Sequence, residues 1–221
     1  MAHDIAFLHT SPVHVPTFSQ LMQELAPALR VAHSVREDLL ADAQQEGVDS
    51  PGLIGRVHAA LAEVAATGAA LVVCTCSTLG GIAESSDGDT PYRVTRIDRA
   101  MADLAARSGP HVLLVATVHS TLAPTAALLQ SSARRLGVSL DIQSLVVADA
   151  WAHFQAGDHA RYIDTVVAAV TKAAPTGIVV LAQASLAPAA ERLIARGISA
   201  LTSPRLGTEH AVALHQQINK V

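Results

Sequence analysis

The sequence VVCTCSTLGG (Val72–Gly81) holds both cysteines of the chain, Cys74 and Cys76, at the end of an apolar run. Branched apolar residues give way there to hydroxyls and glycines. This pattern indicates a buried parallel strand that ends in a turn and then a helix. A second stretch, VVLAQASLAP (Val179–Pro188), repeats the pattern without the thiols. The comparison of the two stretches predicts the fold.

The likeness extends along the chain at a constant offset of 107 residues, which is the separation of Cys76 and Gln183. Three residue pairs at strand ends agree on this offset without a gap: Cys76 with Gln183, Thr10 with Thr117, and Thr95 with Thr202. Any two strand–helix repeats look somewhat alike, and chance likeness is the alternative. The favoured interpretation is two similar halves related by pseudo-symmetry.

Short apolar runs alternate with helical stretches throughout, which predicts an α/β fold. We expect two pseudo-symmetric domains, each a parallel-type sheet flanked by helices, with an active-site cleft between them. The first covers residues 1–97 and 202–221, and the second 98–201. Strands are expected at residues 5–9, 31–35, 69–74, 94–97, 111–116, within 138–147, and at 177–181 and 198–201. Helices are expected at residues 16–29, 52–67, 98–107, 120–136, 159–173, 186–195 and 207–219, with a turn or helix at 38–40 and a loop or short helix near Trp151.

The composition of the 221-residue chain narrows the class of protein. Half of the residues are hydrophobic and only 15% are charged, which excludes a disordered or fibrous chain. The net charge of −4 comes without a basic cluster, so neither nucleic acid nor an anionic membrane is expected as a partner. No apolar run reaches the length of a bilayer span, and no export signal is evident. A cytoplasmic protein with two free thiols is expected.

Small hydroxyl residues gather where the predicted strands end. Together with backbone N–H groups at helix starts, they make a cradle for an anion such as a carboxylate. The alternative is that each one caps a helix, because Ser and Thr are favoured there. The set consists of Thr10, Ser11, Ser77, Thr78, Thr117, Ser120, Thr121, Ser185, Thr202 and Ser203.

Cys76 is the better functional candidate of the two thiols. It lies at the strand-to-helix turn, where amide N–H groups are expected to lower the pKa of a thiol toward neutrality. Such a thiolate is a nucleophile, or a base that takes a proton from carbon. Cys74 is expected to be a small core residue, and the Cys-x-Cys spacing does not predict a metal site. Of the eleven histidines, His119 is the best proton-transfer candidate, because it follows Thr117 closely.

The chain resembles the aspartate/glutamate racemase superfamily, which includes hydantoin racemases, maleate isomerases and arylmalonate decarboxylases. The resemblance covers nearly the whole chain, and the order and spacing of its motifs carry it. The matching stretches are HTSPVHVPTF (9–18), HSVREDLL (33–40), CTCSTLGG (74–81), LLVATVHSTLAPT (113–125), VVLAQASLAPAAERL (179–193) and TSPRLG (202–207).

The resemblance implies an active site in which two cysteines, one from each domain, take and return a proton on opposite sides of the substrate α-carbon. It implies no cofactor, a small carboxylate substrate and a homo-oligomer. Cys76 matches the first cysteine of the family, and Gln183 stands where the second is expected. Glutamine does not titrate, so a two-thiol mechanism is not available. The carboxylate contacts implied by the family fall on Thr10, Ser11, Ser77, Thr78 and Thr117.

Three functions remain open from the sequence. The first is a racemase or isomerase with Cys76 as base or nucleophile and a partner such as His119, His33 or Ser185, with Gln183 among the substrate contacts. The second is a cofactor-free decarboxylase, since a carbanion formed by loss of CO₂ needs only one protonation. The third is a protein that binds a small carboxylate without turning it over. The missing second thiol keeps the last two open.

Overall fold

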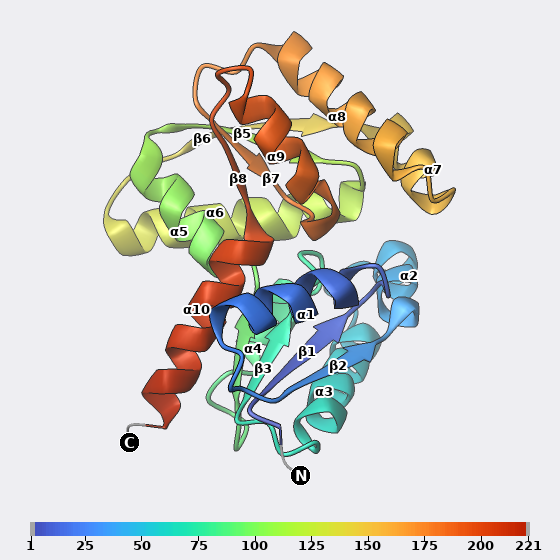
Figure 1. Ribbon diagram of the computed structural model, residues 1–221, viewed down its shortest axis with the longest axis vertical. Helices are drawn as coiled ribbons and strands as arrows, with labels where there is room; N and C mark the ends of the chain where they lie inside the picture. Colours follow the sequence, from blue (N-terminus) through green and yellow to red (C-terminus); the bar gives the residue numbers. More distant parts are fainter. Residues whose placement is uncertain (1–2, 220–221) are drawn as a thin grey trace. The chain divides into compact units, whose positions relative to one another are not determined.

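The computed structural model describes residues 3–219, and the chain divides into two compact units. Unit 1 comprises residues 1–98 and 204–221, and unit 2 comprises residues 99–203. Met1, Ala2, Lys220 and Val221, which belong to the first predicted domain, lie outside the described residues. Each unit contains a four-stranded parallel sheet with helices packed on it (Figure 1). The predicted α/β class with two parallel sheets is confirmed.

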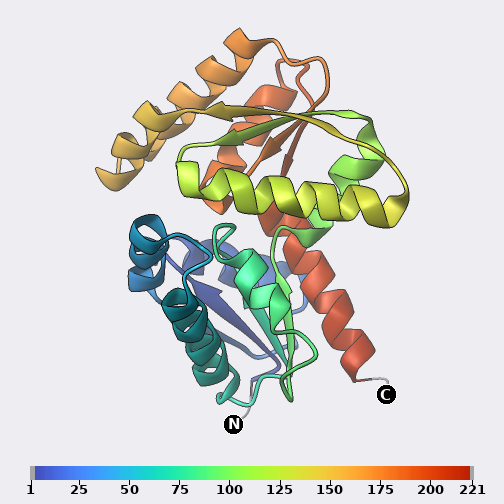
Figure 2. The same cartoon turned by 180° about the vertical axis from the view of Figure 1, so that it is seen from behind.

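The sheet of unit 1 has the order β2-β1-β3-β4, and all its pairings are parallel. Helices α2 and α3 pack beside this sheet, as Figure 2 shows from behind. The elements are β1 (Ile5–His9), α1 (His14–Leu25), β2 (Val31–Val35), α2 (Glu37–Glu46), α3 (Pro51–Ala65), β3 (Leu71–Cys74), α4 (Gly80–Ser85), β4 (Arg93–Arg96) and, beginning at the last residue of unit 2, α10 (Ser203–Ile218).

The sheet of unit 2 has the order β6-β5-β7-β8, again with parallel pairings. It repeats the order of unit 1, and β3 and β7 coincide residue for residue at the offset of 107. The elements are α5 (Arg99–Ser108), β5 (His111–Ala116), the 3-10 turn η1 (His119–Thr121), α6 (Leu122–Leu136), β6 (Asp141–Val146), α7 (Ala148–Gln155), α8 (His159–Ala173), β7 (Ile178–Leu181), the 3-10 turn η2 (Ala184–Leu186), α9 (Ala187–Ile194) and β8 (Ala200–Thr202).

Several helix bounds differ from the prediction for local reasons. The first helix ends at Leu25 rather than at residue 29, because Pro27 follows and pushes Ala26 out of the helical region (φ −154°). The helix expected from residue 120 begins as the 3-10 turn η1 and becomes α6 only at Leu122. The last helix starts at Ser203, because Pro204 suits the first turn of a helix. None of the described helices could cross a bilayer.

The two faces of the unit 1 sheet have different partners. Leu8 and Cys74 belong to the apolar core with α2 and α3, which contribute Leu39 and Leu61 among others. Phe7, which precedes Leu8 on β1, contacts Phe18 of α1 on the other face, with ring centroids 5.4 Å apart. This alternation follows from the two-residue period of a strand. Side chains of neighbouring residues at a strand end therefore point to opposite faces.

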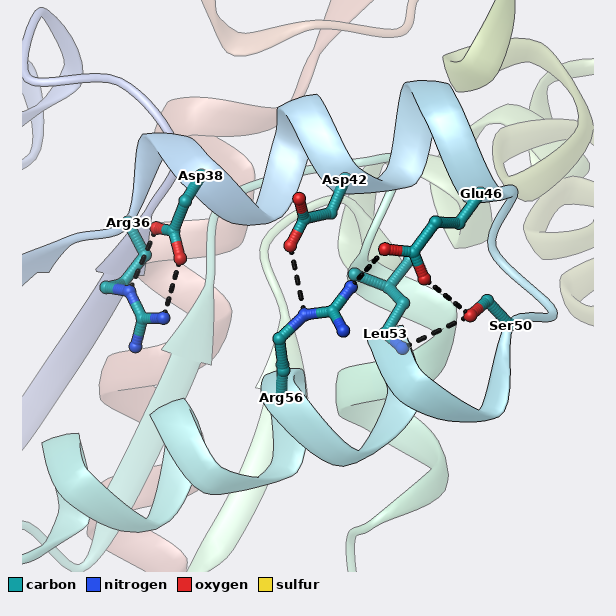
Figure 3. Close-up of polar contacts among 7 residues, drawn as sticks. All are labelled: Arg36, Asp38, Asp42, Glu46, Ser50, Leu53 and Arg56. Carbon is teal, nitrogen blue, oxygen red and sulfur yellow. Dashed lines mark hydrogen bonds and ion pairs between the residues drawn. The ribbon is translucent and has the colours of Figure 1, made fainter.

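An ion-pair network joins α2 to α3 on the surface of unit 1 (Figure 3). Arg56 of α3 contacts Asp42 at 2.9 Å and Glu46 at 2.6 Å, both from α2. Ser50 accepts a hydrogen bond from the Leu53 N–H at 3.4 Å and donates one to Glu46 at 2.7 Å, so it caps α3 and ties it to α2. Exposed ion pairs contribute little energy singly, so this network is expected to add little to the free energy of unfolding.

We predict that Gly207→Ala destabilises the protein by about 2 kcal/mol or more, because it overpacks a close contact. A Cβ at Gly207 would overlap the carbonyl oxygen of Ile97, where α10 docks beside the end of β4. Gly55→Ala is the matched control. It lies in α3 with open space around it, and a gain of about 0.5 to 1 kcal/mol is expected. Urea unfolding followed by circular dichroism measures the unfolding free energy of both variants. Equal changes would contradict the close contact between Gly207 and Ile97.

Candidate active site

Cys76 lies in the turn between β3 and α4, where three hydrogen-bond donors meet its sulfur. The hydroxyl of Thr10, at the end of β1, is one donor. The backbone N–H groups of Thr78 and Leu79 are the other two. The Cys76 side chain is nearly enclosed, with 9% of the residue exposed. Three donors around one sulfur stabilise the negative charge of a thiolate.

Burial nevertheless raises the pKa of the Cys76 thiol, and Asp98 adds to the effect. Thr10 and the two amides act in the opposite direction without overcoming it. The sequence-based expectation of a lowered pKa was wrong, because it counted the amides and not the loss of water around the sulfur. Cys76 is therefore a protonated thiol at neutral pH in the ligand-free protein.

Cys74 is a core residue, as predicted. It is 1% exposed and belongs to the apolar cluster between the sheet and α3. Its thiol donates to the carbonyl oxygen of Cys76 at 3.7 Å, and burial raises its pKa. The two sulfurs thus share one face of the sheet, but only Cys76 is met by a hydroxyl and turn amides.

A buried ion pair contacts the turn between β3 and α4, and the sequence did not reveal it. Arg96 of β4 contacts Asp98 through Nε at 2.6 Å and Nη2 at 3.0 Å, and Nη2 also donates to the Ser77 carbonyl at 3.2 Å. Its guanidinium lies against Gly80, where a Cβ would come within 2.7 Å of Nε. The signal in the sequence was the Gly80-Gly81 pair, together with opposite charges at the end of a predicted strand.

In unit 2, Gln183 occupies the position equivalent to Cys76. Its Oε1 accepts hydrogen bonds from the backbone N–H of Thr117 at 2.7 Å and from the Thr117 hydroxyl at 2.9 Å. Thr117 thus contacts Gln183 as Thr10 contacts Cys76, at the same offset of 107 residues. Because its oxygen is used by Thr117, the amide nitrogen of Gln183 is the end suited to an anion.

Ser185 has a partner that the sequence did not reveal. The hydroxyl of Tyr162, from α8, lies 2.9 Å from Ser185 Oγ and 3.4 Å from Thr117 Oγ1. Tyr162 is fully buried, and burial raises the pKa of its phenol. A lone tyrosine in a helix more than twenty residues away carries no sequence signal for this contact. His119 is exposed in η1, and none of these hydrogen bonds involves it.

The remaining predicted hydroxyls lie at the strand ends of their own units. Ser77 and Thr78 are buried in the turn after Cys76, and Ser11 is half-buried after β1. The hydroxyl oxygens of Ser120 and Ser203 are buried without a hydrogen-bond partner among the described residues. Within residues 3–219, no cluster of three or more His, Cys, Asp or Glu side chains is arranged to hold a metal ion.

No protein-family model matches the chain, and no curated protein matches its sequence. Solved structures do match. An aspartate racemase of Picrophilus torridus aligns with a TM-score of 0.70 at 12% identity, over 98% of this chain and 95% of that one. The chain has the aspartate/glutamate racemase fold.

Two further structures extend the comparison. A glutamate racemase of Bacillus anthracis aligns with a TM-score of 0.74 at 13% identity, over 98% of this chain and 82% of that one. The Gly74Cys mutant of arylmalonate decarboxylase aligns with a TM-score of 0.59 at 20% identity, over 96% and 93%. The racemase-like fold is therefore shared by enzymes that carry different names.

We predict that Arg96→Met costs about 3 kcal/mol or more of unfolding free energy, because it leaves the Asp98 carboxylate buried without its partner. Arg93→Met is the control on the same strand. Arg93 pairs with Asp87 at 2.9 Å but is half exposed, so a loss below about 1 kcal/mol is expected. The comparison is read from urea unfolding midpoints. Equal losses would show that the Arg96 pair does not support the turn.

We also predict that the protein loses stability as the pH falls below about 6.5. Burial, together with repulsion from the protonated forms of His33 of β2 and His14 of α1, lowers the pKa of His9 to about 3. Burial lowers the pKa of His14 to about 4 and also lowers that of His33. Between these values and the unfolded pKa, the unfolded chain binds more protons. Stability therefore falls by up to about 1.4 kcal/mol per pH unit for each histidine.

Unfolding midpoints between pH 7 and pH 4 measure this loss. His14→Gln should reduce the slope, because one of the three histidines with a lowered pKa is removed. A slope that stays flat down to pH 4.5 in the unmodified protein would show that His9 is not held neutral by the fold.

Proposed function

We propose that the protein catalyses cofactor-independent proton transfer at the α-carbon of a small carboxylic acid, with Cys76 as the group that takes or gives the proton. The observation that carries the proposal is the meeting of the Thr10 hydroxyl and two turn amides at the Cys76 sulfur. These donors favour the thiolate when a proton leaves the sulfur. Hydrogen bonds that strengthen as charge develops are the kind that lower a reaction barrier.

The substrate carboxylate is assigned to the hydroxyls beside Cys76. Ser11, Ser77 and Thr78 lie in the same turns as Thr10 and Cys76, at the carboxyl ends of β1 and β3. Parallel sheets bind ligands at that end. The proposal assigns a second set of contacts to unit 2, where Gln183 offers its amide N–H groups. Thr117 contributes by fixing Gln183, since both of its hydrogens are already donated to the Gln183 oxygen.

In a racemase or isomerase, the first step breaks the bond between the α-carbon and its hydrogen. For this step the Cys76 thiol must first release its own proton to solvent, which leaves a thiolate stabilised by the Thr10 hydroxyl and the two turn amides. The thiolate then takes the α-proton, and the electron pair of the broken bond moves into the carboxylate to give an enediolate. The reverse step returns a proton to the carbon. Inversion requires a second proton donor, and we propose Ser185 for this role. The Tyr162 hydroxyl at 2.9 Å replaces the proton that Ser185 gives up. His119 is the other predicted donor.

A decarboxylase is the second candidate, and the protonated thiol favours it. Loss of CO₂ leaves an electron pair on the α-carbon, and Cys76 then gives that carbon its proton. This role needs a thiol before the reaction, which is the form that burial maintains. A decarboxylase also needs only one proton donor. This agrees with Gln183, a residue that does not titrate, at the position equivalent to Cys76. An amino acid or hydantoin substrate belongs to the first candidate, and a malonate to the second.

We predict that deuterium enters the α-position of a substrate from D₂O and that this depends on Cys76. Proton NMR with a panel of amino acids, hydantoins, hydroxy acids and substituted malonates measures it. Exchange without CO₂ release indicates racemase or isomerase chemistry, and CO₂ release with one deuterium in the product indicates the decarboxylase. Cys76→Ala should abolish either activity. Cys74→Ala is the matched control and should retain at least about a third of the rate.

Retention of activity in Cys76→Ala would contradict the assignment. A compound that raises the melting temperature of the protein but is neither exchanged nor decarboxylated would instead support binding without chemistry. The expected rise follows from the concentration of the compound relative to its dissociation constant.

A further inference from the structure

Four side chains of unit 1 form an unbroken chain of hydrogen bonds on the sheet face that carries α1. Thr75, directly after β3, contacts His9 Nδ1 of β1 at 2.8 Å. His9 Nε2 contacts His33 Nδ1 of β2 at 2.9 Å, and His33 Nε2 contacts Ser19 Oγ of α1 at 3.0 Å. This series of hydrogen bonds joins three neighbouring strands and the helix that covers them.

Aromatic rings enclose the two imidazoles. Phe7 stacks on His33 with centroids 5.3 Å apart, and Phe18 lies 5.6 Å from His9. His9 is completely buried, and the Thr75 hydroxyl also lies within reach of the Leu8 carbonyl at 3.2 Å. A polar chain in such surroundings is stable only when each member has its partner, so the geometry of its members is tightly fixed.

The hydrogen-bonded series from Thr75 to Ser19 is connected to Cys76 through the pairing of β1 with β3. The register runs from Ile5 beside Leu71 to Leu8 beside Cys74. Just past this register, the Thr75 N–H donates to the Leu8 carbonyl at 3.0 Å and the Thr75 hydroxyl contacts His9. Thr10 and Cys76 are the next residues, beyond the ends of both strands, and the Thr10 hydroxyl meets the sulfur. Because successive side chains alternate between faces, the His9–Thr75 and Thr10–Cys76 contacts are expected on opposite sides of the two strand ends.

We propose that His9 and His33 are positioning residues for Cys76. By holding the end of β1 against the residue that precedes Cys76, they set the distance at which the Thr10 hydroxyl meets the sulfur. Neither imidazole touches the thiol, and no step of the chemistry passes through them. The proposal rests on the proposed role of Cys76, but it concerns the properties of the thiol and can be tested without a substrate.

Geometry and burial together set the protonation states of the two imidazoles. Their contact at 2.9 Å needs one N–H and one free nitrogen, so His9 and His33 cannot both be charged. Burial lowers the pKa of each ring and favours the form in which both are neutral. The Thr75 hydroxyl donates to the Leu8 carbonyl at 3.2 Å and so accepts from His9, which sets the direction of the other bonds in the neutral form.

The test measures the pKa of Cys76 from the pH dependence of its alkylation by iodoacetamide. All variants are made in Cys74→Ala protein, so that one thiol reacts. Thr10→Val removes the direct hydrogen bond and should raise the pKa by about one pH unit. Thr75→Val and His33→Phe leave Thr10 in place, and each should raise it by about half a pH unit. Alkylation at pH 7.5 then slows about threefold for these two and about tenfold for Thr10→Val.

The controls separate positioning from general loosening of the fold. Thr208→Val removes an equally buried hydroxyl of unit 1 that bonds within its own helix, to Pro204 O at 2.7 Å, and should leave the pKa unchanged. Thr75→Ser restores the hydroxyl and should restore the pKa. If Thr75→Val does not fold, His33→Phe carries the test, because His33 is half-buried and phenylalanine keeps the ring stack.

The proposal is overturned if Thr75→Val and His33→Phe leave the pKa of Cys76 where it was. It is also overturned if Thr208→Val changes that pKa as much as they do. Failure of the proposed function gives a different result, in which the thiol responds to these variants as expected but no substrate exchanges or loses CO₂. The two failures are therefore distinguishable.

Discussion

The parallel pairing of β1 with β3 is the constraint on which the candidate site depends. It brings the Thr10 hydroxyl to the sulfur of Cys76 on one face and the His9 ring to Thr75 on the other. The turn after β3 then adds the amides of Thr78 and Leu79. No single element supplies these groups, so the site exists only when the two strands end in register. Buried Arg96 holds the turn through the Ser77 carbonyl, which explains the glycine at position 80.

Burial and hydrogen bonding act on Cys76 in opposite directions. Burial keeps the proton on the sulfur, whereas the three donors stabilise the charge that appears once the proton leaves. A thiol of this kind serves an enzyme that gives a proton to a carbanion. An enzyme that takes a proton from its substrate needs the thiolate, so there the thiol must first lose its own proton, and the three donors stabilise the charge that this leaves. Gln183, held by Thr117, has no titrating group, so the position of unit 2 equivalent to Cys76 cannot act as an acid or a base.

Much of the fold could be predicted from the sequence, because its decisive signals are local. Continuous apolar runs marked the buried strands, and the offset of 107 residues marked the repeat that the two sheet orders share. The site was harder to predict. The place of Cys76 at a strand end follows from the sequence, but its pKa depends on burial by residues far along the chain. Tyr162 was missed because nothing near it in the sequence indicates its contacts with Ser185 and Thr117. Arg96 and Asp98 are close in the sequence, but the burial of their ion pair depends on packing that the sequence does not reveal.

The most direct test of the central claim is carbon-13 NMR of protein labelled at the β-carbons of Cys74 and Cys76, titrated with malonate as a small carboxylate. The account predicts that the Cys76 resonance moves and saturates as malonate binds. The Cys74 resonance, from a thiol at the end of β3 within the core, should move much less and serves as the internal reference. A Cys76 resonance that stays in place while malonate binds elsewhere on the protein would contradict the claim that carboxylates are bound beside this sulfur.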